Sequence, residues 1–173
     1  MNYIKIDDGN GSRGIEALYY QEIKALYIYP TNHREDWKSN FAGWICPKYV
    51  KGYGLVNRVW WKEVEWLAKH LKGVSILRGG GWSKGGSQAQ YLAFLRPGFQ
   101  VFSTAGFPAK PLGKLNGELY KKRGDVIPLF SRRRYEEAHT ISPWRWPWKA
   151  HIFTREEREK ITLNKYNSFT KNH

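Results

Sequence analysis

The sequence has very little cysteine and no long apolar run. Its single cysteine, Cys46, cannot form an internal disulfide, and no stretch of roughly 18 or more apolar residues could span a membrane. The amino-terminal residues MNYIKIDDGNG carry acidic side chains where a signal peptide needs an apolar segment. Together these absences predict a protein of the reducing cytoplasm, without disulfides or membrane-spanning segments.

Acidic residues are also scarce relative to basic ones. Fifteen Asp and Glu against 29 Lys and Arg give a formal net charge of +14, and nine tryptophans accompany that charge. Basic residues with tryptophan are typical of two kinds of partner, nucleic acid and the surface of an anionic membrane. The 173 residues, 41% of them hydrophobic, predict one domain over residues 1–173 with a sizeable core.

Hydrophobic periodicity predicts alternating strands and helices. Apolar and β-branched runs predict strands, and helical spacing of apolar residues predicts helices. We expect a loop over 31–54, strands at 15–22, 24–30, 74–77, 99–106 and 117–124, and helices at 55–73, at 87–98 and from 154. This order is typical of a mainly parallel α/β sheet flanked by helices.

The segment GWSKG, residues 81–85, fits the pattern G-x-S-x-G between a predicted strand and a predicted helix. In that setting the pattern indicates a nucleophile elbow, a sharp turn that exposes the Ser83 hydroxyl. The N–H groups of the following helix, that of Lys84 first, would hold an oxyanion. A phosphate-binding P-loop is excluded because Lys84 precedes Gly85 instead of following it.

A serine nucleophile needs a base and an orienting carboxylate, which follow it along the chain in this topology. Asp125 comes directly after a predicted strand and is the candidate acid. His139 and His151 are the candidate bases, since His173 is the terminal residue. The remaining histidines and the single cysteine show no metal-ligand spacing, so we expect no metal and no organic cofactor.

Several motifs between residues 24 and 153 resemble, in order, those of the lipase class 3 (fungal-type triacylglycerol lipase) family of α/β-hydrolases. The matching segments are IYPTNHREDW (28–37), YVKGYGLV (49–56), GWSKGG (81–86), TAGFP (104–108), DVIPLF (125–130) and AHIF (150–153). The resemblance implies Ser83 as nucleophile, Asp125 as acid and His151 as base. It also implies Thr31 as an oxyanion donor and places His139 in a loop past the acid, although Tyr29 and Pro30 replace the family's Arg and Gly.

The segment 131–149 is rich in aromatic and basic residues directly before His151. Its candidate contact residues are Trp144, Arg145, Trp146, Trp148 and Lys149. Three interpretations stay open: the indoles pack on the core, they line an acyl pocket or touch an anionic membrane, or the segment binds nucleic acid. Trp82 and the Lys84 cation, beside the serine, are further candidates for contact with an anionic substrate or membrane.

The sequence thus predicts a compact, minimal α/β-hydrolase fold. The expected activity is hydrolysis of carboxylic esters (lipase, esterase or phospholipase) through a Ser-His-Asp triad and an acyl-enzyme. The expected partners are an ester or lipid substrate and an anionic membrane surface contacted peripherally, and no nucleic-acid-binding motif is present. The alternative is a lipase-like scaffold that binds anionic lipid or nucleic acid without catalysis.

Overall fold

A computed structural model of the chain describes residues 2–10, 14–30, 42–43, 45–104, 115–121, 123 and 135–140. The strands are β1 (Ile4–Asp7), β2 (Glu16–Tyr20), β3 (Ala25–Ile28), β4 (Lys48–Val50), β5 (Gly54–Val56), β6 (Arg78–Trp82), β7 (Gln100–Thr104), β8 (Leu115–Lys121) and β9 (Tyr135–Thr140). The helices are α2 (Arg58–His70) and α3 (Lys84–Leu95). Neither helix is long and apolar enough to cross a membrane, within the residues described.

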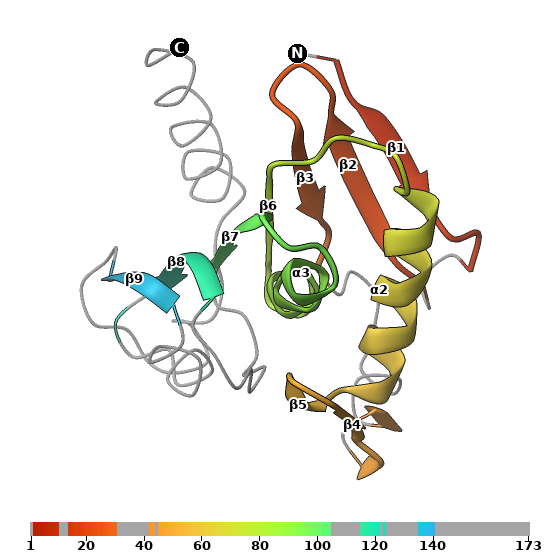
Figure 1. The fold of residues 1–173 in the computed structure, drawn as a ribbon, viewed down its shortest axis with the longest axis vertical. Coiled ribbons are helices and arrows are strands. Elements are labelled where there is room, and N and C mark those ends of the chain that lie inside the picture. Colours follow the sequence, from red (N-terminus) through yellow and green to blue (C-terminus); the bar gives the residue numbers. More distant parts are fainter. Residues whose placement is uncertain are drawn as a thin grey trace.

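Seven strands form one mixed sheet in the order β1-β2-β3-β6-β7-β8-β9, with β6 in the middle (Figure 1). The pairs β1–β2 and β2–β3 are antiparallel, and every pair from β3 to β9 is parallel. The prediction of a mainly parallel α/β sheet is therefore confirmed. Because the carboxyl ends of parallel strands meet at one edge, the chain leaves β3, β6, β7, β8 and β9 on the same side of the sheet.

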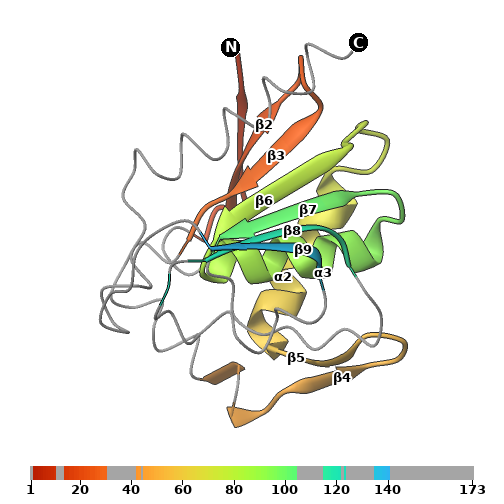
Figure 2. The ribbon, with the colours of Figure 1, turned by 90° about the vertical axis from the view of Figure 1, so that its left-hand side faces the viewer.

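Helices α2 and α3 pack on the same face of the sheet (Figure 2). Helix α2 begins at Asn57, whose side chain accepts hydrogen bonds from the N–H groups of Val59 and Trp60. Its apolar stripe of Trp60, Val64 and Leu67 is fully buried. The core between the helices and the sheet also contains Leu26, Ile28, Ala89, Leu92 and Val101, all fully buried.

The predicted strand at 74–77 is wrong, because the strand is formed by Arg78–Trp82 and consists mainly of glycine. A Cβ atom on Gly79 would lie 2.8 Å from the carbonyl oxygen of Leu26, and one on Gly81 would lie 2.5 Å from that of Ile28. Both oxygens belong to the neighbouring strand β3. Close packing at the centre of the sheet therefore selects glycine here, although its intrinsic strand propensity is low.

Three other elements differ from the sequence prediction. The predicted loop 31–54 contains the hairpin strand β4, paired antiparallel with β5. Strand β9 lies within the segment 131–149, which had no predicted strand, and β1 extends the sheet before the first predicted strand. The predicted helix from 154 lies outside the described residues.

Candidate active site

Ser83 occupies the turn between the central strand β6 and helix α3 (Figure 1). Its backbone has φ 53° and ψ −118°, and it is one of two non-glycine residues with positive φ in the described part of the chain. A residue held in such a sparsely populated region costs on the order of 1–3 kcal/mol and usually marks a functional position. The predicted strand–turn–helix around this serine is therefore present, in a strained conformation. Ser83 is buried, however, with 8% of its surface exposed, so the expectation that the turn exposes this residue is wrong.

Glycine is required on both sides of Ser83. A Cβ atom on Gly81 would lie 2.6 Å from the carbonyl carbon of Gly85, and one on Gly85 would lie 2.8 Å from the carbonyl oxygen of Tyr29. Both contacts are to backbone, which has little room to move. The pattern G-x-S-x-G thus has a steric cause, since helix α3 can approach β3 and β6 this closely only where those side chains are absent.

Helix α3 begins at the serine itself, earlier than the predicted start at residue 87. The carbonyl oxygen of Ser83 accepts hydrogen bonds from the Ser87 N–H (3.1 Å) and from Ser87 Oγ (3.3 Å). The first-turn N–H groups of a helix have no partner within the helix, and the positive end of the helix dipole lies there. Lys84 is the first residue of α3, so its N–H is the first of these donors along the chain after Ser83.

The Lys84 side chain is buried and ion-paired. Its Nζ lies 3.1 Å from each carboxylate oxygen of Glu63 on α2 and donates to the Gly14 carbonyl at 3.3 Å. Gln88, one helical turn further along α3, donates from Nε2 to the same carboxylate. The expectation that Lys84 offers its cation to an anionic substrate or membrane is wrong, because the ammonium is directed into the contact between α2 and α3.

Glu63 and Gln88 are components of this region that the sequence analysis missed. A helical signal existed, because Lys84 and Gln88 are four residues apart and so share one face of α3. Nothing local identified Glu63 as their partner, since the contact depends on how α2 packs against α3.

The other predicted site residues divide into two groups. Trp82 is half-buried as the last residue of β6, and His139 lies in β9 opposite Tyr120, so its expected place in a loop is wrong. The rest lie outside the described residues: Thr31, Asp125, Trp144, Arg145, Trp146, Trp148, Lys149 and His151.

The described residues contain no group of three or more His, Cys, Asp or Glu side chains that could hold a metal ion. The fold and site define a mixed, mostly parallel α/β protein with a strained serine after its central strand. Searches of protein-family models, of curated proteins and of solved structures found no match to the chain.

Proposed function

We propose that this protein is a serine hydrolase that cleaves carboxylic esters, on a minimal α/β-hydrolase fold. The observation that carries the proposal is the conformation of Ser83, a non-glycine residue at φ 53° between a central parallel strand and a helix. Such a turn presents a hydroxyl at the carboxyl edge of the sheet, beside the amino terminus of a helix. A serine with a purely structural role has no need of this backbone strain.

In the proposed reaction, Ser83 Oγ attacks the acyl carbonyl and His151 takes its proton. Asp125 fixes the imidazole tautomer and stabilises the imidazolium. The alcohol leaves with a proton from His151, and water then hydrolyses the acyl-enzyme by the same base. The strand order supports this assignment, because Asp125 follows the last residue of β8 by four positions and β8 is parallel to the strand that precedes Ser83.

The proposed oxyanion hole consists of the Lys84 N–H and a donor from Thr31. Thr31 follows the last residue of β3 by three positions, and β3 is the parallel neighbour of β6. The buried pair with Glu63 restrains Lys84, the residue whose N–H would contact the developing negative charge. The reaction needs neither a metal nor an organic cofactor, and Trp82, Trp144, Arg145, Trp146 and Trp148 are proposed to contact the substrate.

A panel of p-nitrophenyl esters of increasing acyl length tests the proposal, with wild type compared with Ser83→Ala. We expect turnover of at least one ester and a loss of about 10⁴-fold or more in Ser83→Ala. Ser75→Ala is the matched control, because Ser75 is an exposed serine outside the strand–turn–helix and should be dispensable. Folded wild type with no turnover of any ester would favour the alternative of a non-catalytic binding protein.

A further inference from the structure

The β4–β5 hairpin has one face turned to the protein and one turned to solvent. Tyr49 pairs directly with Leu55, so their side chains share a face, while Val56 pairs with Lys48 on the opposite face. Val56 is fully buried, whereas Tyr49 is 65% exposed and Leu55 47% exposed. The outward face of the hairpin is therefore apolar, which is the reverse of the usual pattern for a strand at a surface.

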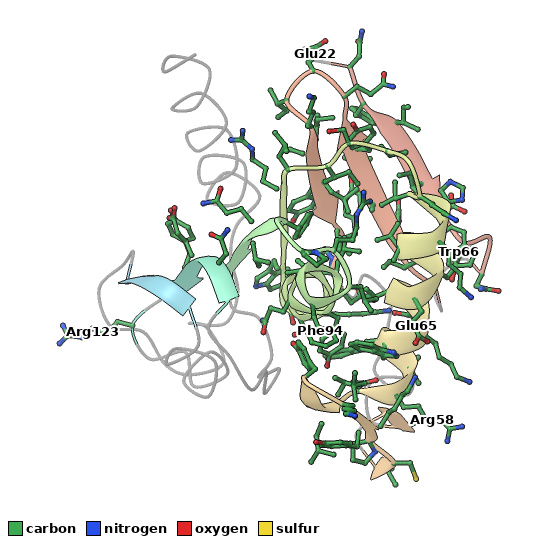
Figure 3. The ribbon with its side chains drawn as sticks, in the orientation of Figure 1. Glu22, Arg58, Glu65, Trp66, Phe94 and Arg123 are labelled. Atoms are coloured by element: carbon green, nitrogen blue, oxygen red, sulfur yellow. The ribbon has the colours of Figure 1, made fainter. Side chains whose placement is uncertain are left out.

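The hairpin is held firmly on the two helices. Tyr53, in its turn, is fully buried, and its ring centroid lies 5.9 Å from Trp61, 5.5 Å from Tyr91 and 5.1 Å from Phe94. Phe94 lies between α3 and the hairpin (Figure 3) and is itself 38% exposed. The hairpin is therefore packed on both helices through Tyr53. The exposure of Tyr49 and Leu55 is not caused by a loosely attached hairpin.

Among the described residues, exposed apolar side chains are concentrated near the β4–β5 hairpin. Seven large hydrophobic side chains are exposed in the described part of the chain, and four of them belong to the hairpin, its base and the residues just before it. We name these four the hairpin patch: Ile45, Tyr49, Leu55 and Phe94. Tyr49 and Leu55 are neighbours on the outward face, and Phe94 packs against Tyr53 in the turn of the hairpin. Clustered exposed apolar side chains mark interaction sites more often than scattered single residues do.

The charged residues of the segment 45–58 are all basic, and one of them, Lys48, pairs with Glu65 of α2 at 3.4 Å. Lys48, Lys51 and Arg58 are exposed, and residues 45–58 contain no Asp or Glu. Arg58 points away from the body of the protein at the start of α2 (Figure 3). An apolar patch with a basic border matches the boundary between the headgroups and acyl chains of an anionic bilayer.

We propose that the hairpin patch docks on an anionic lipid bilayer. Tyr49, Leu55 and Ile45 enter the headgroup boundary, and the basic side chains meet lipid phosphates. Nucleic acid would use the positive charges but would leave Ile45 and Leu55 exposed to water, so the bilayer accounts for more of the surface. The assignment of this docking surface uses no residue of the segment 144–149 and does not depend on Ser83 being a nucleophile.

The single cysteine provides a local reporter, because Cys46 is exposed and lies two residues before β4. A polarity-sensitive fluorophore on Cys46 should shift to the blue with vesicles of phosphatidylglycerol and phosphatidylcholine, and should not respond to phosphatidylcholine alone. Ser83→Ala should show the same shift, so a failure of the docking proposal is distinguishable from a failure of the esterase proposal. No shift with anionic vesicles, or an equal shift with both kinds, overturns the proposal.

Paired substitutions locate the surface. Tyr49→Ser with Leu55→Ser should weaken co-sedimentation with anionic vesicles by about tenfold or more. The matched control is Tyr3→Ser with Ile4→Ser, since these residues are 58% and 46% exposed and adjoin the start of β1, a strand that lies far from the hairpin (Figure 1), so binding should be unchanged. Lys51→Gln should reduce binding about fivefold, and Lys72→Gln, at the other end of α2, should not.

Three results would overturn the assignment to the hairpin patch. The first is loss of vesicle binding in a Trp144, Trp146 and Trp148→Ala variant but not in the Tyr49 and Leu55 variant. The second is tight binding of single-stranded or duplex nucleic acid with no vesicle binding. The third is concentration-dependent dimerisation that the hairpin substitutions abolish while vesicle binding is absent, which would identify a second copy of the chain as the occupant.

Discussion

The ion pair between Glu63 and Lys84 gives the sharpest prediction about stability. The two side chains are 7% and 4% exposed, and both carboxylate oxygens lie 3.1 Å from Nζ. Loss of one partner leaves the other charge buried and unpaired, which typically costs about 3–5 kcal/mol. Glu63→Gln keeps the shape and removes the charge, so we expect a loss of about 3 kcal/mol in the free energy of unfolding, a large share of the roughly 5–15 kcal/mol of a typical domain.

Urea unfolding at pH 7 measures this loss. Glu65→Gln is the matched control, because Glu65 lies two residues further along α2 in an exposed pair with Lys48 (3.4 Å), and such pairs contribute about 1 kcal/mol or less. The double variant Glu63→Gln with Lys84→Met removes both charges and should be more stable than Glu63→Gln alone. If Glu63→Gln and Glu65→Gln lose the same small amount, the buried pair does not contribute as its geometry suggests.

Two further predictions concern Ser83 and Tyr91. Ser83→Gly relieves the strain of the positive φ, whereas Ser83→Ala keeps it. The glycine variant should therefore be about 1 kcal/mol more stable in urea unfolding than the alanine variant. A more stable alanine variant would contradict the assignment of strain to this position. Burial raises the pKa of Tyr91 above its usual 10.0, so ionisation in the unfolded state should erode stability as pH rises past 10. Tyr91→Phe should show a shallower loss between pH 9 and 11 than wild type, by up to about 1.4 kcal/mol per pH unit, and parallel curves would refute this contribution.

The sequence was informative where a local pattern has one dominant physical cause. The helical spacing of Val59, Trp66 and Leu67 predicts α2 because a helix that packs on a core needs an apolar stripe. The fully buried stripe is formed by Trp60, Val64 and Leu67. The pattern G-x-S-x-G predicts the turn at Ser83 because the two glycines are needed for close backbone contact. Alternation of strands with helices likewise predicts a mainly parallel sheet.

The sequence was misleading where tertiary packing overrides local preference. Strand β6 was predicted in the apolar residues 74–77, but the sheet centre accepts only the glycines that follow. The side chain of Lys84 looked like a free cation beside the serine, because its partner Glu63 is 21 residues away on another helix. Strand β9 was missed because its sequence, YEEAHT, is too polar to show the alternation expected of a strand.

The covalent adduct of the protein with a fluorophosphonate tests the central claim most directly. Intact-mass measurement after reaction, followed by mass spectrometry of the digest, shows how many groups attach and where. The account predicts one phosphonyl group, on Ser83, and none on heat-unfolded protein or on Ser83→Ala. A label on any other serine, or no label on folded wild type, would contradict the assignment of Ser83 as an activated nucleophile.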